Sequence, residues 1–166
     1  SKSFKVITCS KFIRMSSLKI AGLNLDIIWK NKEANFQLIE QELSSVEADL
    51  FLLPEMFSTG FCMEADEVAD RNLETLTWMK SFAKRKNSAV AGSVSVEENG
   101  KFYNRFYFVF PDESFEYYDK RHWFSYSGED KIYTAGTNRK IIDYKGFKIL
   151  LQVCFDLRFP VFSRNQ

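Results

Sequence analysis

Three residues with side chains suited to covalent catalysis follow predicted strands of the chain. Glu55 comes just after the apolar run 50–53, Lys120 lies where an aromatic strand runs into a polar loop, and Cys154 ends the apolar run 149–153. A carboxylate at the end of a buried strand is suited to general base catalysis. A lysine can stabilise a developing oxyanion, and a cysteine at a strand-to-helix turn can be a nucleophile. Together, a carboxylate, a lysine and a cysteine at such positions predict catalysis by a cysteine thiol.

Each of these residues also has an ordinary structural interpretation. Glu55 can be a solvated carboxylate, Lys120 a surface cation, and Cys154 a buried, unreactive thiol. His122 is the one histidine of the chain, so a cysteine–histidine dyad would have to use it. Its neighbours, an arginine and a tryptophan, favour a histidine that packs in a loop over one that serves as the base for Cys154.

Composition limits the protein class. The 166 residues are 45% hydrophobic, which predicts one domain with a real core. The 23 Lys and Arg nearly balance the 22 Asp and Glu, so nucleic acid and anionic membranes are unfavourable partners. No apolar run approaches the roughly 20 residues of a membrane span, and we expect a soluble protein. The three cysteines form no C-x-x-C pair, which argues against a disulfide framework and a zinc site and favours the cytoplasm.

The hydrophobic pattern predicts an α/β domain with a mixed sheet. Apolar alternation, helical spacing and turn residues predict strands at 18–25, 49–53, 89–96, 102–110 and 115–118, helices at 31–47 and 73–83, a long irregular loop at 119–138, and a hairpin of 140–144 with 147–153. In such sheets functional sites collect at the carboxyl ends of strands. Residues 1–16 are basic and are interpreted as an N-terminal extension of a domain spanning 17–166.

Three segments carry a resemblance to a known family. They read LPEMFSTGF at 53–61, YDKRHWF at 118–124 and VCFDLRFP at 153–160. Together they resemble the nitrilase superfamily of carbon–nitrogen hydrolases, and among its branches they are most similar to the omega-amidases. Their order matches that of the family, as do the separations of 65 and 34 residues between the glutamate, the lysine and the cysteine.

The resemblance implies a fold, a triad and a reaction. The family fold is an α-β-β-α sandwich with mixed sheets, and its catalytic triad falls on Glu55, Lys120 and Cys154. The backbone N–H of Phe155 would help to hold the oxyanion, and Glu129 would support Lys120 or the substrate. The implied reaction is hydrolysis of a small linear amide of a dicarboxylic or keto acid, through a cysteine thioester, without metal or cofactor. A complete family member is expected to form a homodimer.

Residues beside the triad are candidates for the substrate pocket. Aromatic side chains there can line a pocket or belong to a core, and they are Phe57, Phe61, Trp123 and Phe124. A substrate carboxylate needs a cation or hydroxyls, for which the candidates are Arg121, Ser125, Tyr126 and Arg158. Arg158 can instead be a buried arginine paired with Asp156. Cys62 is expected to be a small packing residue.

The family domain is considerably longer than this chain. We therefore expect the chain to lack the C-terminal part of that domain. An alternative function is then a truncated, inactive nitrilase-like domain that serves as a binding or assembly module. A third possibility is a neighbouring branch of the family, such as a carbamoylase or a nitrile hydrolase, which would differ in its pocket residues.

Overall fold

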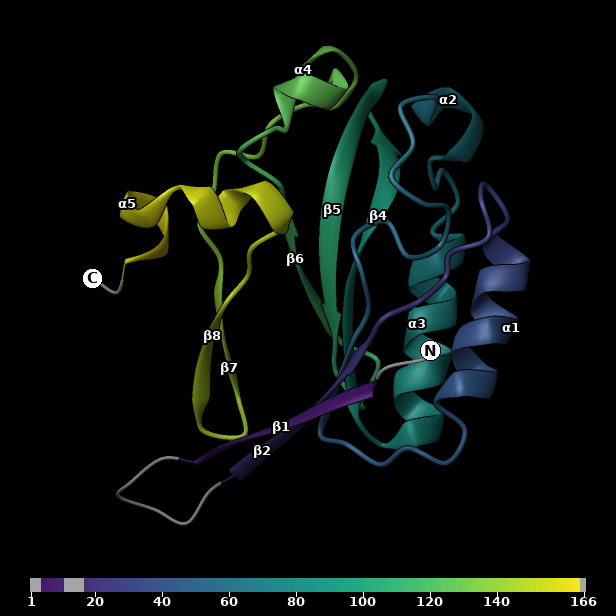
Figure 1. Ribbon diagram of the computed structural model, residues 1–166, viewed down its shortest axis with the longest axis vertical. Coiled ribbons are helices and arrows are strands. Elements are labelled where there is room, and N and C mark those ends of the chain that lie inside the picture. The colour runs from purple at the N-terminus through teal and green to yellow at the C-terminus, as the bar shows by residue number, and fades with distance from the viewer. Residues whose placement is uncertain (1–3, 11–16, 165–166) are drawn as a thin grey trace.

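The structure is a computed structural model that describes residues 4–10 and 17–164 (Figure 1). Its main sheet has six strands in the order β1-β2-β3-β4-β5-β6, and a second sheet consists of β7 and β8. The strands are β1 (Phe4–Ser10), β2 (Ser17–Leu23), β3 (Leu50–Leu52), β4 (Ala89–Glu98), β5 (Lys101–Val109), β6 (Phe115–Asp119), β7 (Ile141–Tyr144) and β8 (Phe147–Leu150). The helices are α1 (Lys32–Glu42), α2 (Ala65–Val68), α3 (Glu74–Lys86), α4 (Glu129–Ile132) and α5 (Pro160–Ser163), with 3-10 turns η1 (Ser125–Ser127) and η2 (Cys154–Arg158).

Strand directions bring two distant segments to one edge of the main sheet. β2, β3 and β4 run parallel, whereas β5 is antiparallel to β4 and β6 is antiparallel to β5. β6 therefore runs in the direction of β3, and the carboxyl ends of both strands face the same edge. β3 is short: Leu52 pairs with Ala91, and β4 continues to Glu98 beyond it. The chain that follows β3 consequently lies beside the later part of β4.

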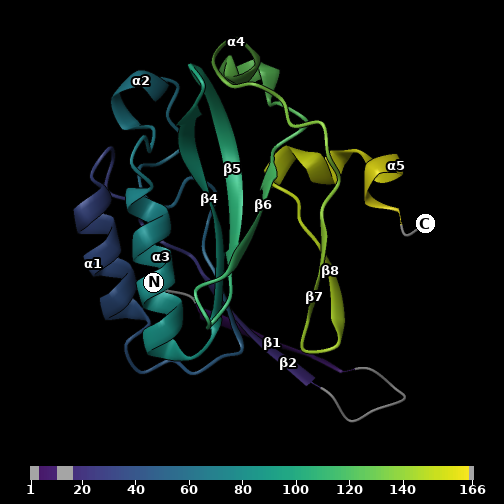
Figure 2. The ribbon, with the colours of Figure 1, turned by 180° about the vertical axis from the view of Figure 1, so that it is seen from behind.

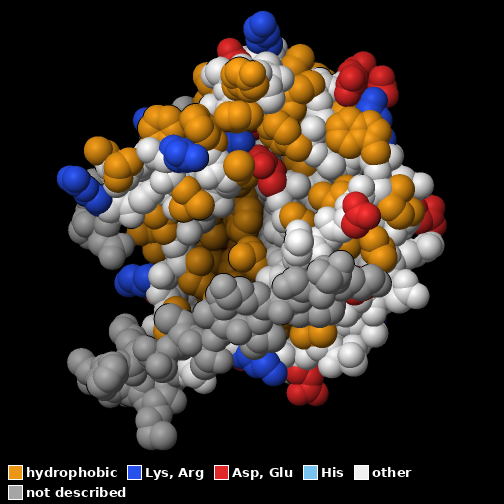
Figure 3. Space-filling view, viewed as in Figure 1, with side chains coloured by type: hydrophobic (Ala, Val, Ile, Leu, Met, Phe, Trp, Pro, Cys, Tyr) orange, Lys and Arg blue, Asp and Glu red, His pale blue; other side chains and the backbone are white. Residues whose placement is uncertain are grey.

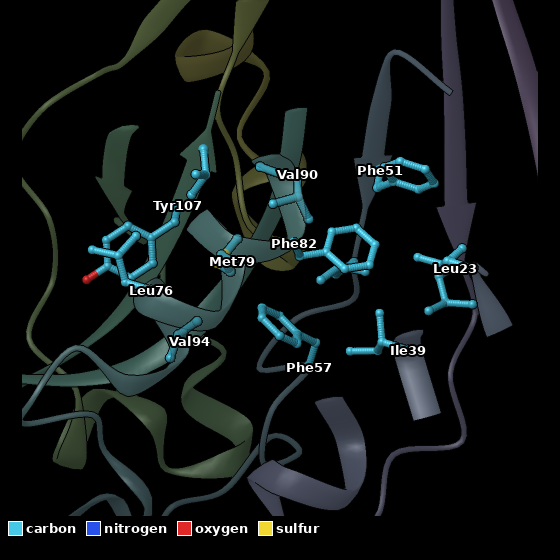
Figure 4. Packing of buried hydrophobic residues seen from close by; sticks show 14 of the residues in the cluster. Leu23, Ile39, Phe51, Phe57, Leu76, Met79, Phe82, Val90, Val94 and Tyr107 are labelled. Atoms are coloured by element: carbon cyan, nitrogen blue, oxygen red, sulfur yellow. The ribbon is translucent and has the colours of Figure 1, made fainter. Parts of the chain in front are cut away.

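Helices α1 and α3 cover one face of the main sheet (Figures 1 and 2). The periodic residues of both helices meet the sheet there, and Ile39, Leu43, Met79 and Ala83 are fully buried. Figure 4 shows Phe51, Phe82, Met79 and Ile39 gathered between this helix layer and the strands. Burial of such side chains contributes about 1.5–3 kcal/mol each to stability. This layer is the main hydrophobic core.

The opposite face of the sheet is covered in part by the β7–β8 hairpin. Residues of both sheets form a second buried cluster, which includes Leu18, Phe108, Tyr118, Ile142 and Leu151. An apolar groove of about 490 Å³ remains between the hairpin and strands β2 to β5. Figure 3 shows hydrophobic side chains lining this hollow.

Most predicted elements are confirmed, with shifted ends. Helix α1 ends at Glu42 rather than at residue 47, because the serines at 44 and 45 favour a turn. Helix α3 begins at Glu74, since the carboxylate of Asp70 accepts a hydrogen bond from the N–H of Thr75. Leu73, predicted to lie on the buried face of this helix, is instead 49% exposed.

The remaining differences concern shorter segments. The predicted strand 147–153 ends at Leu150, and the predicted loop 119–138 contains η1 and α4. The predicted extension 1–16 contributes β1, which pairs antiparallel with β2 along residues 4–10. The rest of that extension, and the side chain of Cys9, lie outside the described residues.

The fold is a mixed α/β fold of the expected kind. One helix layer, the six-stranded sheet and the first hairpin of a second sheet are present in the described part of the chain. The helices on the hairpin side of the sheet, α4 and α5, have four residues each. Over 4–10 and 17–164, no helix is both long enough and apolar enough to cross a membrane.

Gly136 fixes the backbone around Lys120. Its N–H donates to the carbonyl oxygen of Lys120 at 2.9 Å. A Cβ at this position would lie 2.0 Å from the carbonyl oxygen of Asp119, which is backbone and cannot rotate away. We expect Gly136→Ala to lower the free energy of unfolding by about 1–3 kcal/mol, measured by urea denaturation. Thr137→Ala, at the exposed neighbouring residue, is the matched control, and equal stability of both variants would contradict this prediction.

Candidate active site

Glu55 lies on a tight turn that follows β3. Pro54 ends the strand, and Met56 adopts a left-handed backbone conformation with a φ of 46°. The N–H of Met56 donates to the hydroxyl of Ser93 on β4 at 2.9 Å, and its carbonyl accepts from Gly60 at 2.8 Å. These bonds anchor the turn to the part of β4 that extends beyond β3. The carboxylate of Glu55 is thereby held at the carboxyl edge of the sheet.

Lys120 follows β6 at the same edge. Its backbone N–H donates to the carbonyl of Asn104 on β5 at 2.9 Å, which continues the strand pairing by one residue. The side chain is 1% exposed. Its Nζ lies 2.9 Å from Oε1 of Glu55 and 2.9 Å from Oε2 of Glu129. The structure therefore brings together three of the predicted site residues around one ammonium group.

Glu129 is a fully buried carboxylate at the start of α4. Gly128 precedes it with a φ of 83°, a conformation that lets the chain turn into the helix. Oε2 of Glu129 accepts from Lys120 and from the backbone N–H of Phe124 at 2.7 Å. Its Oε1 accepts from Nδ2 of Asn104 at 3.2 Å. A buried charge is tolerated when it is paired and hydrogen-bonded in this way.

The two carboxylates keep Lys120 protonated. Burial alone acts to lower the pKa of the ammonium group, but the charges of Glu55 and Glu129 and the hydrogen bonds to both outweigh it. The pKa of Lys120 consequently lies above its ordinary value. Lys120 is therefore a fixed cation that can stabilise negative charge, and it is not suited to accept a proton.

Cys154 is the first residue of η2 and has a left-handed φ of 44°. Such a conformation is uncommon and strained for a residue other than glycine. Burial raises the pKa of the thiol, as do the charge of Glu55 and the hydrogen bond to it, whereas Lys120 acts in the opposite direction. The pKa of Cys154 lies above its ordinary value, so at neutral pH its side chain is a thiol, which could act as a nucleophile only with the help of a base.

Asp156 connects the nucleophile turn to the segment that carries Lys120. It is fully buried and accepts hydrogen bonds from the hydroxyl of Tyr118 at 2.8 Å and from the backbone N–H of Val153 at 3.0 Å. It also bonds the backbone N–H and the Nδ1 of His122, at 2.9 and 2.7 Å. His122 stacks on Phe159 with ring centroids 3.8 Å apart. These contacts support a packing role for His122 rather than a dyad with Cys154.

Arg158 does not pair with Asp156. The sequence had left open a buried arginine at this position, but Arg158 is exposed and the carboxylate of Asp156 is occupied by other donors. The other candidates for binding a substrate carboxylate are also exposed: they are Arg121, Ser125 and Tyr126, the last at 94%.

The four aromatic pocket candidates separate into two groups. Phe61 lies over the ammonium group of Lys120, with Nζ 5.4 Å from the ring centroid, and Trp123 packs in the same small cluster as Phe61. The ring of Phe124 contacts that of Phe155 at 5.5 Å. Phe57, in contrast, is fully buried in the main core and packs against Trp78. Its proposed pocket role is corrected to a core role, because the turn after Glu55 directs it toward the helix layer.

Sequence reasoning missed Asn104. It is a buried polar residue of strand β5, which is rich in aromatic residues, and its side chain bonds both glutamates of the site. A polar side chain at an inward-facing strand position was the available signal. Cys62, predicted to be a packing residue, is buried, and its thiol donates to the carboxylate of Glu64 at 3.0 Å.

Comparisons with known proteins show the family of the chain. Residues 19–165 match the model of the carbon–nitrogen hydrolase family. The chain is 42% identical to omega-amidase YafV of Yersinia enterocolitica over 153 residues, which cover 92% of this chain and 60% of the relative. It is 32% identical to 2-oxoglutaramate amidase of Bacillus subtilis over 152 residues, or 88% of this chain and 59% of the relative.

A solved structure matches the fold closely. The crystal structure of XC1258 from Xanthomonas campestris, described as a CN-hydrolase superfamily protein with an arsenic adduct in the active site, aligns with a TM-score of 0.86 and 37% identity. The match covers 90% of this chain and 57% of that one. The chain thus spans about 60% of the length of the curated relatives described above.

The raised pKa of the thiol leads to a test of Glu55. Glu55→Gln keeps a hydrogen-bond acceptor for Lys120 but removes the negative charge, and Glu129 remains as a counter-ion. We expect the pKa of Cys154 to fall, because two of the contributions that raise it come from Glu55. The measurement is the rate of Cys154 alkylation by iodoacetamide as a function of pH, with peptide mass spectrometry to assign the modified cysteine.

A matched control is available at the other described thiol. Glu64→Gln removes the carboxylate beside Cys62 and should leave the alkylation profile of Cys154 unchanged. If the alkylation profile of Cys154 stays at the same pH or moves to higher pH in Glu55→Gln, then Glu55 does not raise the pKa of this thiol.

Proposed function

Because the chain belongs to the carbon–nitrogen hydrolase family, we propose that its site hydrolyses a small linear amide to a carboxylic acid and ammonia. The observation that carries the proposal is the buried ammonium group of Lys120, held 2.9 Å from each of two carboxylates. One of these carboxylates, Glu55, also acts on the thiol of Cys154. The turn after β3, the end of β6 and the turn after β8 would therefore supply a base, a fixed cation and a nucleophile.

The first half of the proposed reaction acylates the enzyme. Glu55 takes the proton of the Cys154 thiol as Sγ attacks the amide carbonyl carbon, so that a thiolate never accumulates. The oxygen of the tetrahedral intermediate is stabilised by Lys120 and by the backbone N–H of Phe155. Glu55 then donates its proton to the amide nitrogen, the C–N bond breaks, and ammonia leaves a thioester on Cys154.

The second half releases the acid. Glu55, again a carboxylate, accepts a proton from a water molecule that attacks the thioester carbonyl. The same donors hold the second oxyanion. As the C–S bond breaks, the proton returns from Glu55 to Sγ, which restores the thiol and frees the carboxylic acid. Lys120 keeps its protons throughout, consistent with its raised pKa.

The substrate class is proposed from the relatives and the surroundings of the site. The relatives are named as omega-amidases and as a 2-oxoglutaramate amidase, and we infer a short omega-amide of a dicarboxylic or keto acid. Phe61, Trp123 and Phe124 would contact its carbon chain. The buried indole N–H of Trp123 has no hydrogen-bond partner among the described residues, and it is available as a donor to the substrate. A cytoplasmic homodimer is part of the same proposal.

The test is ammonia release from a panel of short omega-amides that includes 2-oxoglutaramate, using the full-length gene product. We expect turnover with the wild-type protein and a fall to the uncatalysed rate in Cys154→Ala, because the nucleophile is removed. Intact mass spectrometry of rapidly quenched samples should detect an acyl adduct on the wild type alone. Cys62→Ala, at the other described thiol, should retain activity, because this thiol bonds Glu64 and takes no part in the proposed reaction.

The result also decides between this proposal and the alternative. A folded wild-type protein that releases no ammonia and forms no adduct would contradict the amidase proposal. It would favour a binding or assembly module, for which the exposed apolar groove beside the hairpin provides a surface. Equal activity of Cys154→Ala and the wild type would show that hydrolysis uses another residue.

A further inference from the structure

We propose that Asn104 is a positioning residue that selects which oxygen of Glu55 acts as the base and holds the two carboxylates of the site apart. This inference rests on the proposed amide hydrolysis for its catalytic consequence. The positioning itself is a property of the hydrogen-bond network and can be measured without turnover.

The side chain of Asn104 closes a ring of hydrogen bonds. Its Nδ2 donates to Oε1 of Glu55 at 2.8 Å and to Oε1 of Glu129 at 3.2 Å. Lys120 joins the same two carboxylates from the other side, at 2.9 Å in each case. The backbones of the two residues are joined as well, because the N–H of Lys120 donates to the carbonyl oxygen of Asn104 at 2.9 Å. Asn104 is 1% exposed, so water does not compete for these bonds.

The ring of hydrogen bonds leaves one donor of Lys120 and one oxygen of Glu55 free. An amide nitrogen has two hydrogens, and Asn104 uses one for each glutamate. An ammonium group has three, and Lys120 uses two, which leaves one for a developing oxyanion. Both Asn104 and Lys120 bind the same oxygen of Glu55, Oε1. The other oxygen, Oε2, is the one left to take the proton of the Cys154 thiol.

Charge explains why a neutral donor is needed at this position. Glu55, Glu129 and Lys120 together carry a net charge of −1, beside a thiol that must lose a proton. Two carboxylates in close proximity favour protonation of one of them, whereas hydrogen bonds to the ionised forms favour deprotonation. The amide group of Asn104 supplies such bonds to both carboxylates without adding a positive charge that would compete with Lys120 for the oxyanion.

The other half of the amide distinguishes Asn104 from a structural asparagine. Its Oδ1 is buried and has no hydrogen-bond partner among the described residues. Asn35, an equally buried asparagine at α1, is paired at both ends: Oδ1 accepts from the N–H of Ile28, and Nδ2 donates to the carbonyls of Ile28 and Ser58. An unpaired buried carbonyl oxygen lowers the stability of the folded protein. The side chain of Asn104 is therefore oriented to donate to the two carboxylates, although its own oxygen is left without a partner.

The experiment compares Asn104→Leu and Asn104→Asp with the wild-type full-length gene product. The first readout is the titration of the Glu55 side-chain carboxyl by ¹³C NMR, with the resonance assigned through Glu55→Gln. We expect Glu55 to titrate at higher pH in Asn104→Leu, because a hydrogen bond to its ionised form is lost. The titratable groups that face Glu55, namely Lys120, Glu129, Cys154 and Tyr133, are unchanged in this variant.

The second readout is steady-state ammonia release from 2-oxoglutaramate across pH. We expect kcat to fall about 10- to 100-fold in Asn104→Leu, the effect of losing a hydrogen bond to a charged group, with KM within about twofold of the wild type. The acid limb of the kcat profile should move to higher pH. Asn104→Asp should lose more, since a third carboxylate would face the other two. The urea midpoint of Asn104→Leu is measured in parallel, because the lost hydrogen bonds to two carboxylates also lower stability, and both readouts are taken well below the transition.

Phe106→Leu is the matched control. Phe106 is the next residue of β5 on the same side and packs in the second cluster away from the ring. This variant should lower the urea midpoint and leave the Glu55 titration in place. A Glu55 titration that does not move in Asn104→Leu overturns the proposal, whether or not activity falls. A shifted titration in a protein without amidase activity supports the positioning role and overturns the proposed reaction instead.

Discussion

The buried ammonium group of Lys120 is the constraint on which the site depends. A lysine that is 1% exposed loses the solvation of its charge, and its burial is tolerated only because two carboxylates approach it to 2.9 Å. These carboxylates come from the turn after β3 and from the start of α4, and the lysine comes from the end of β6. These charges can therefore pair only when the turn after β3, the end of β6 and the start of α4 lie next to one another.

The direction of the strands brings these segments together. β6 returns to the direction of β3 after two antiparallel pairings, which places Lys120 and Glu55 at one edge although 65 residues separate them. The nucleophile is held by a different contact. Asp156 accepts hydrogen bonds from Tyr118 and His122 on the lysine segment and from Val153 next to the cysteine. A second buried carboxylate network thus ties the turn that carries Cys154 to the segment that carries Lys120.

Much of this arrangement could be predicted from the sequence, and the rest depends on packing. Periodicity and strand-end positions predicted the sheet, both long helices and the meeting of Glu55 with Lys120, whereas the place of Glu129 beside them was implied by the family resemblance. The role of Phe57 could not be separated from that of Phe61, because both are aromatic and six residues or fewer from Glu55. The difference arises from the left-handed turn at Met56, which sends Phe57 into the core. Asn104 was missed because its partners are remote in the sequence.

The electrostatics of the site favour a thiol that stays protonated until a carbonyl carbon is in place. The carboxylates outnumber the cation in the ring, and burial adds to their effect in raising the pKa of Cys154. A preformed thiolate would react with any electrophile that reached this exposed residue. In the proposed reaction, deprotonation and attack are coupled through Glu55, so that Cys154 would become nucleophilic only when a substrate aligns with Lys120. The negative charge that makes the thiol less acidic would be the same charge that makes Glu55 an effective base.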